Sequence, residues 1–234
     1  IVACYAENNI SVVGLTDPDD EVDGDGLPHR NAISGPHQVD YGREMAWLQL
    51  HVYWEEDHAG RPVPLAIPVL CQHCHQAPCE SVCPVYAPYQ TPEGLNGQVY
   101  NRCVGTRFCA NNCPYKVRRF NWLAWPRPWP LPLQLNPDVT TRSDGVMEKC
   151  TFCVQRIRAV KEEAKMDGRE LADGDVVPAC VQTCPTGALV FGDLADEDSR
   201  VSRLSRSERG YHLLGQVGTR PAITYLQRIV RWRD

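Results

Sequence analysis

The 234-residue sequence predicts an α+β fold made of two small units with long connecting loops. Three observations support this prediction. The chain contains 12 cysteines that gather in spaced groups, and 19 prolines interrupt it often enough to keep its elements short. Segments with helical spacing and segments with strand-like alternation are both present.

The predicted elements differ in how clearly the sequence marks them. Met45–Trp54 alternates apolar and polar residues and predicts a strand. Cys153–Met166 has apolar residues at helical spacing and is expected to stop at Gly168. Weaker candidates are the start of a short helix at Cys4–Asn9, a short strand at Ala188–Phe191, a polar helix at Arg200–Arg209, and a strand or helix at Ala222–Val230.

Two segments are expected to be loops. Thr16–Gly26 is acidic and glycine-rich, and it resembles a calcium loop only in part. If Asp19 is its first position, Arg30 stands where a bidentate glutamate is required, so a solvated loop is the favoured interpretation. Trp122–Pro137 has tryptophans between closely spaced prolines, which excludes a helix or a central strand and predicts an extended, partly polyproline-like loop.

Composition excludes two classes of protein. The formal net charge of −5 with scattered arginines does not fit a nucleic-acid-binding protein, which normally carries a basic face. No stretch approaches the roughly 18 uncharged apolar residues of a membrane-spanning helix. The best candidates, Pro62–Leu70 and Trp122–Leu135, are short and broken by prolines. We therefore expect no nucleic-acid partner and no membrane crossing by this segment.

The cysteine spacing carries the most specific chemistry. The groups are Cys71-x2-Cys74-x4-Cys79-x3-Cys83, Cys103-x5-Cys109-x3-Cys113, and Cys150-x2-Cys153 followed after 26 residues by Cys180-x3-Cys184, with Cys4 standing alone. A proline follows the last cysteine of each group. Bacterial ferredoxins use this arrangement: closely spaced cysteines hold one cubane, and the cysteine before the proline ligates the other cluster. The sequence therefore predicts tandem ferredoxin-like units of the bacterial two-[4Fe–4S] type.

The spacing has a local physical reason. Close spacing wraps the backbone around one cluster and points its N–H groups at the sulfurs. The x3 gap allows one helical turn, which carries the last cysteine to the second cluster. A proline fits there because its fixed φ and missing N–H suit a change of direction.

Because the cysteine before each proline is expected to ligate the neighbouring cluster, the ligands of each cluster can be assigned. The predicted sets are Cys71, Cys74, Cys79 and Cys113 for one [4Fe–4S] cluster; Cys83, Cys103 and Cys109 for a [3Fe–4S] cluster; and Cys4, Cys150, Cys153 and Cys180 for a second [4Fe–4S] cluster. Cys184 remains, and by symmetry it is expected to ligate a fourth cluster. The chain begins at Ile1 without a Met or a signal peptide, so it is interpreted as a piece of a longer polypeptide whose upstream cysteines complete that cluster.

Thr106 determines the predicted type of one cluster. Cys103–Cys109 would read C-x2-C-x2-C if residue 106 were cysteine. A threonine hydroxyl is a poor iron ligand at neutral pH, because a thiolate forms far more readily. With one corner unheld, a three-iron cluster is favoured, and we expect it to accept electrons at higher potential than its neighbours.

Other interpretations of the cysteines are weaker. Cys71–His75 matches the haem-attachment pattern C-x-x-C-H, but haem would leave Cys79 and Cys113 without a role, and His75 is then only a surface histidine. A zinc site at Cys150–Cys184 does not explain the Cys-Pro steps. A disulfide framework is usual in much shorter secreted domains.

The remaining features leave the chain without a catalytic centre of its own. The basic run Lys116, Arg118 and Arg119 fits a reduced cluster or a partner as well as it fits a solvated face. The Trp/Pro loop could pack on a membrane subunit or fold over its own domain. No Ser-His-Asp group, phosphate loop or pair of carboxylates stands out.

Several motifs resemble the four-cluster iron–sulfur subunits of molybdopterin oxidoreductases. They are CxHCxxxPCxxVCP at Cys71–Pro84, the Cys103–Trp122 segment, MEKCTFCVQRI at Met147–Ile157 and PACVQTCPTGAL at Pro178–Leu189. CYAENNISVVG at Cys4–Gly14, GREMAW at Gly42–Trp47 and CVGTRFCANNCPYKVRRFNW at Cys103–Trp122 are similar to the iron–sulfur domain of the B subunit of alternative complex III. The acidic loop departs from that pattern.

This resemblance implies an electron-transfer role. Residues 1–234 would form the iron–sulfur domain, with an inner unit at 71–121 and an outer unit made of 1–60 and 145–234. The family implies partners: an upstream molybdopterin-enzyme-like domain lacking the cofactor, c-type cytochrome subunits, and a multi-helix membrane subunit that binds menaquinol or another quinol. It also implies a peripheral position on the periplasmic face of the bacterial inner membrane. A subunit that feeds a true molybdenum site in a polysulfide or dimethyl sulfoxide reductase is the alternative.

Overall fold

The computed structural model describes residues 1–11, 43–57, 59–122 and 127–229. The predicted acidic loop at 16–26 lies outside these residues, as does part of the Trp/Pro loop.

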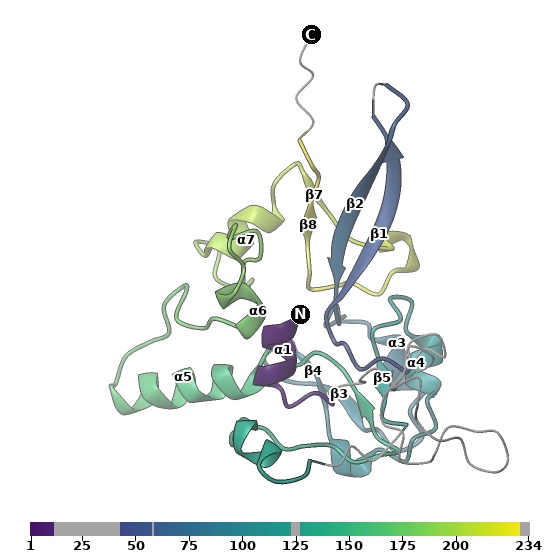
Figure 1. Ribbon diagram of the computed structural model, residues 1–234. Coiled ribbons are helices and arrows are strands. Elements are labelled where there is room, and N and C mark those ends of the chain that lie inside the picture. Colours follow the sequence, from purple (N-terminus) through teal and green to yellow (C-terminus); the bar gives the residue numbers. More distant parts are fainter. Residues whose placement is uncertain (12–42, 58, 123–126, 230–234) are drawn as a thin grey trace, which may run out of the picture.

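Short helices and strands make up the described part of the chain (Figure 1). The α-helices are α1 (Val2–Glu7), α3 (Pro78–Ser81), α4 (Phe108–Asn112), α5 (Val154–Met166), α6 (Ala179–Gln182) and α7 (Arg200–Ser205). Three 3₁₀ turns are η1 (Tyr100–Arg102), η2 (Leu131–Gln134) and η3 (Gly215–Val217). Most helices are a turn or two long because prolines, glycines and cysteine loops interrupt the chain at short intervals.

The strands of the described residues pair as four two-stranded antiparallel sheets. The pairs are β1 (Gln49–Glu56) with β2 (Pro62–Val69), β3 (Pro88–Gln90) with β4 (Asn96–Gln98), β5 (Arg119–Phe120) with β6 (Met147–Glu148), and β7 (Gly210–Tyr211) with β8 (Tyr225–Leu226). The β1–β2 ribbon stands out from the body (Figure 1). This mixture of short helices and small sheets agrees with the predicted α+β class.

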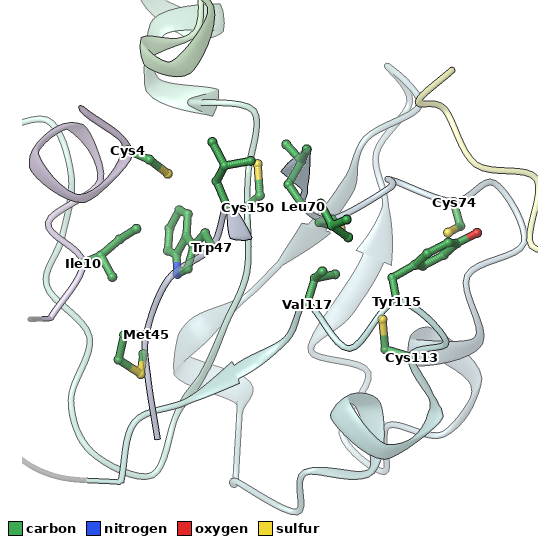
Figure 2. Close-up of a cluster of buried hydrophobic side chains, with 13 residues drawn as sticks. Cys4, Ile10, Met45, Trp47, Leu70, Cys74, Cys113, Tyr115, Val117 and Cys150 are labelled. Carbon is green, nitrogen blue, oxygen red and sulfur yellow. The ribbon is translucent and has the colours of Figure 1, made fainter. Parts of the chain in front are cut away.

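The core lies below the base of the ribbon and contains many cysteines. Met45, Trp47 and Val117 are almost completely buried in it. Five of its thirteen buried members are Cys4, Cys71, Cys74, Cys113 and Cys150. Figure 2 shows Cys4 and Cys150 near Trp47 at one end of this core, and Cys74 and Cys113 near Tyr115 at the other. The predicted cluster ligands are therefore part of the core itself.

A network of buried polar groups joins the segments of this core. Glu148 is fully buried and accepts hydrogen bonds from Trp47 Nε1 at 3.1 Å and from Asn121 Nδ2. It also forms an ion pair with Arg142 at 2.9 Å. Arg142 in turn donates to the carbonyl oxygen of Asn8 at 2.9 Å, which ties the N-terminal segment to the centre of the chain.

The stronger element predictions are confirmed with shifted ends. The helix predicted at Cys153–Met166 is α5, with Cys153 in the left-handed region at its N-cap. The predicted strand at Met45–Trp54 is β1, but pairing begins only at Gln49 and continues to Glu56. Met45 and Trp47 are buried in the core and lie outside the ladder, so their alternation reflects burial and not strand pairing.

The weaker predictions fare unevenly. A helix forms near Cys4 as α1 and another at Arg200 as α7, which ends at Ser205. The short strand predicted at Ala188–Phe191 is wrong: the segment is irregular, and no strand pairs with it among the described residues. In the described part of the predicted element at Ala222–Val230, residues 222–229, the only regular structure is the two-residue strand β8. Within the Trp/Pro loop, the expected extended backbone is wrong at η2, where prolines at the first positions favour a 3₁₀ turn.

No helix in the described portion of the chain is long and apolar enough to span a membrane.

Candidate iron–sulfur centres

Cys71, Cys74, Cys79 and Cys113 line one hollow, here called the first hollow. These are the four cysteines predicted to hold one [4Fe–4S] cluster. All four are buried, and the walls between them are largely apolar. Cys71 and Cys74 come from the loop after β2, Cys79 comes from α3, and Cys113 follows α4.

Cys83, Cys103 and Cys109 line another hollow, here called the second hollow. Thr106 also lines it, at the position where a fourth cysteine would complete the C-x2-C-x2-C spacing. Backbone N–H groups point at two of the sulfurs: Ala87 donates to Cys83 Sγ at 3.3 Å, and Met147 donates to Cys103 Sγ at 3.4 Å. Hydrogen bonds of this kind stabilise the anionic thiolates that bind iron.

The third predicted set also comes together, from α1, α6 and the start of α5. The Asn8 side-chain amide lies 3.7 Å from both Cys4 Sγ and Cys153 Sγ. The Phe152 N–H donates to Cys150 Sγ at 3.4 Å. Cys180 lies close enough to Cys4 and Cys153 for their thiolates to repel one another.

Cys184 is half-buried, lies just after the end of α6 and stands apart from these sets. Its sulfur lies 3.6 Å from Thr186 Oγ1. Hydrogen bonds from Thr186 and from the backbone N–H groups of Leu189 and Ala188 lower the pKa of the Cys184 thiol to about 7. The thiolate that a metal binds is therefore available near neutral pH.

A single helical turn separates the two cysteines of each C-x3-C pair, as predicted. Cys79 lies in α3, and the chain then turns to bring Cys83 to the second hollow. Cys109 lies in α4, and Cys113 returns to the first hollow. The two helices pack against each other. Each helix therefore places one cysteine in one hollow, and the segment after it places the next cysteine in the other hollow.

Burial disfavours free thiolates at these sites. It raises the pKa of Cys4 to about 12 and of Cys74 to about 11, and it raises the pKa of Cys150 well above its ordinary value. Nearby cysteines add to the increase at Cys4, because Cys153 and Cys180 repel its thiolate. Positive iron supplies the charge that offsets both effects, so deprotonation and metal binding are coupled here.

Two buried cations lie beside the first hollow. The side chains of Arg118 and Lys149 are almost inaccessible to solvent, and neither forms an ion pair with a carboxylate of the described residues. Lys149 Nζ donates to the carbonyl oxygens of Cys150, at 2.9 Å, and of Asn96. Buried charges are costly unless an opposite charge compensates them. A thiolate-ligated cluster is anionic, so these residues fit a cluster in the adjoining hollow.

The loops of two sites interlock through a pair of rings. His73 precedes Cys74, and Phe152 precedes Cys153, so each ring occupies the same position in its C-x2-C loop. Both residues have positive φ, at 44° and 54°. Their rings stack with centroids 3.9 Å apart. His73 is fully buried, and this burial lowers its pKa well below the usual value, so the imidazole is neutral.

Sequence reasoning missed several of these roles. The basic run divides three ways: Lys116 is exposed, Arg119 pairs with Glu44 at 2.8 Å, and Arg118 is buried at the first hollow. His75 is exposed, as the cluster interpretation expected, but the buried His73 had no assigned part. No spacing rule separates these neighbours, because all but Arg119, which begins the two-residue strand β5, lie in irregular segments without a period.

The hollows favour a multi-iron group. In the described residues, no three His, Cys, Asp or Glu side chains gather as ligands of a single metal ion. Zinc requires its thiolates at about 2.3 Å from one centre. The cysteines of the two hollows instead lie around open space.

Comparison with known proteins agrees with this chemistry. Residues 64–125 match one family model described as a 4Fe–4S dicluster domain, and residues 102–188 match a second with the same description. These tandem dicluster matches show [4Fe–4S] clusters as the cofactors and support the ferredoxin-like prediction. They cover every predicted ligand except Cys4.

Individual relatives extend the match over almost the whole chain. The iron–sulfur cluster-binding subunit of menaquinone reductase from Nitratidesulfovibrio vulgaris is 37% identical over 97% of this chain and 82% of its own length. A putative dimethyl sulfoxide reductase iron–sulfur subunit from Halobacterium salinarum is 41% identical, over 68% of this chain and 54% of its own length. Iron–sulfur subunit 1 of an Hdr-like menaquinol oxidoreductase from Archaeoglobus fulgidus is 39% identical, over 76% of this chain and 63% of its own length.

The chain thus spans most of the first relative and less than two thirds of the other two. The cysteine hollows, the tandem dicluster matches and these relatives together show that the chain belongs to the family of iron–sulfur cluster-binding electron-transfer subunits of molybdopterin-oxidoreductase-type complexes.

Proposed function

We propose that this chain relays electrons within a membrane-bound complex that oxidises menaquinol or another quinol, as in alternative complex III. Two of the relatives, a menaquinone reductase subunit and a menaquinol oxidoreductase subunit, support an exchange with the quinone pool. The clusters supply one-electron redox chemistry, and the chain holds them in a fixed series.

The second hollow carries this proposal. It presents three cysteines, with Thr106 in place of a fourth, and so favours a [3Fe–4S] cluster. A cluster of relatively high potential suits a quinol donor, so electrons enter at this site. α3 and α4 then connect it directly to the first hollow, and the loops of His73 and Phe152 connect the first hollow to the Cys4, Cys150, Cys153 and Cys180 set.

The proposed partners follow this order. A multi-helix membrane subunit supplies quinol at the second hollow, and c-type cytochrome subunits accept electrons from the complex. Cys184 serves a fourth cluster, whose other ligands lie upstream of this chain. A further proposed partner is an upstream molybdopterin-enzyme-like domain that lacks the cofactor. The chain then lies peripherally on the periplasmic face of the membrane, with its inner unit at 71–121 and its outer unit at 1–60 and 145–234.

A second candidate function is electron delivery to a true molybdenum site. The similarity to the putative dimethyl sulfoxide reductase protein favours it, as does a 33% identical iron–sulfur subunit of an arsenate respiratory reductase from Shewanella. A molybdenum assay on the purified intact complex separates the two candidates. Stoichiometric molybdenum favours the reductase, and its absence from a complex that is active with quinol favours the quinol-oxidising complex.

The direct test is iron and acid-labile sulfide per chain, together with an electron paramagnetic resonance spectrum of the oxidised sample. The ligand sets predict about 11 irons, or about 15 when upstream sequence completes the fourth cluster. They also predict the signal of an oxidised three-iron cluster that disappears when a menaquinol analogue is added to the intact complex. Zinc without sulfide excludes electron transfer, and a three-iron signal that menaquinol leaves unchanged excludes entry at the second hollow.

A further inference from the structure

Arg118 lies where the two hollows approach each other. Its side chain is part of the wall of the first hollow. The same guanidinium lies beside the sulfurs of Cys79, in the first hollow, and of Cys109, in the second, and its charge favours the thiolate of each. One positive charge therefore faces ligands of two different predicted clusters.

The guanidinium is held in place by one side chain from the wall of each hollow. Its Nη1 donates to Gln98 Oε1 at 2.7 Å, and its Nη2 donates to Asn96 Oδ1 at 3.3 Å. Asn96 is itself fixed, because its N–H donates to His73 Nδ1 at 3.1 Å and its side-chain amide donates to Glu80. The charge cannot swing away from the hollows without breaking this network.

The charge is also poorly screened. Arg118 is 5% exposed, and it has no ion pair with a carboxylate in the part of the chain that the structure describes. Buried charges interact through a medium of low dielectric and are little affected by dissolved salt. An added electron makes a cluster more negative, so a fixed positive charge stabilises its reduced form and raises its potential.

Arg118 is placed differently toward the two hollows. Its side chain lines the first hollow but not the second, where Arg107 is the lining arginine. Arg118 should therefore raise the reduction potential of the [4Fe–4S] cluster more than that of the three-iron cluster. This matters because an electron that enters at a higher-potential three-iron cluster must move energetically uphill to a cubane of lower potential.

We propose that Arg118 raises the reduction potentials of both clusters and raises that of the first hollow more, which narrows the potential gap between them. Arg118 is thus a residue that tunes the electron-transfer step without ligating iron. The inference rests on the proposed ligand sets, but not on quinol as the donor.

The test is a redox titration of each cluster, followed by electron paramagnetic resonance, in the intact complex after its iron content has been measured. Arg118→Gln is expected to lower both midpoint potentials, the first hollow's more, so that the gap widens. Arg118→Lys keeps the charge and should stay near the wild-type potentials. Arg119→Gln is the matched control: it removes the same charge one residue away, where Glu44 pairs with it at 2.8 Å.

A second variant covers the case in which Arg118→Gln loses its clusters. Gln98→Glu places a carboxylate where Gln98 now accepts from Arg118 Nη1, and so neutralises the guanidinium without removing it. It should lower both midpoint potentials; because Gln98 itself lines the second hollow, the relative size of the two shifts is read from Arg118→Gln. The shift should persist at high salt, because the guanidinium of Arg118 is buried.

Each outcome bears on a different statement. If a cluster-loaded Arg118→Gln or Gln98→Glu variant keeps the potentials of the Arg119→Gln control, the proposal for Arg118 is wrong. Equal shifts of the two midpoint potentials in Arg118→Gln contradict the proposal that Arg118 narrows the potential gap between the clusters. A wild-type complex that contains no three-iron cluster contradicts the proposed ligand sets instead.

Discussion

Thr106→Cys is expected to convert the three-iron cluster into a cubane. Thr106 lies on the surface and in the wall of the second hollow, so a cysteine there displaces no core side chain. The preceding loop is held tightly, because Gly105 has a φ of +75° and packs close to the carbonyl oxygen of Gly145. The new thiol therefore stands where the C-x2-C-x2-C spacing needs it.

The expected magnitude follows from one added ligand. Iron should rise by about one atom per chain, from about 11 to about 12. Folding stability should change by less than about 0.5 kcal/mol, as for other exposed substitutions. The three-iron signal of the oxidised sample should disappear, the potential of the site should fall, and quinol oxidation should slow.

Two control variants test whether a thiol at residue 106, and not any substitution in the second hollow, changes the cluster type. Thr106→Ser keeps a hydroxyl and should keep the three-iron signal. Val104→Cys places a thiol in the same hollow at the wrong spacing, and it should also keep the signal. A Thr106→Cys protein with unchanged iron content and an unchanged signal would refute the assignment of Thr106 as the determinant of cluster type.

Other variants test the packing around the sites. Gly105→Ala should cost about 1–3 kcal/mol in a denaturant titration, because φ is +75° and the new Cβ would lie 2.5 Å from the Gly145 carbonyl oxygen. Arg142→Met should cost about 3–5 kcal/mol in the same titration, since it leaves buried Glu148 without its ion-pair partner. Removal of iron by a chelator should abolish the native circular dichroism, because the cysteines form part of the core. Iron affinity in reconstitution should rise with pH by up to about tenfold per thiol and pH unit, because burial raises the pKa of thiols such as Cys4, to about 12, and iron must displace their protons.

Each of these has a result that contradicts it. Gly145→Ala, at φ +78° with open space around the new Cβ, should cost only about 1 kcal/mol, and an equal loss in both variants would remove the steric argument. Adding Glu148→Gln to Arg142→Met should recover part of the lost stability; no recovery would mean that the charge is not the cause. A native circular dichroism spectrum of the iron-free protein would mean that the fold does not depend on the clusters. An affinity for iron that does not change with pH would mean that the thiols are already ionised.

Features that depend on the local spacing of residues could be predicted from the sequence. The C-x3-C pairs fold as single turns at Cys79 and Cys109 because three intervening residues leave little alternative. The period of α5 is equally local. Features that depend on distant contacts were not predictable: the burial of Arg118 depends on Gln98 and Asn96, some twenty residues earlier in the chain. Ala188–Phe191 has the composition of a strand, but no neighbouring strand of the described residues pairs with it.

The stacked rings of His73 and Phe152 have a consequence for how the protein is assembled in the cell. Each ring sits in the loop that wraps one cluster, and each is held in place by the ring of the other loop. A loop that has not yet closed on its iron cannot offer a fixed surface to its neighbour. We therefore expect cluster insertion at the two sites to be cooperative: the first loop to close on its cluster presents a fixed ring to the loop of the second site.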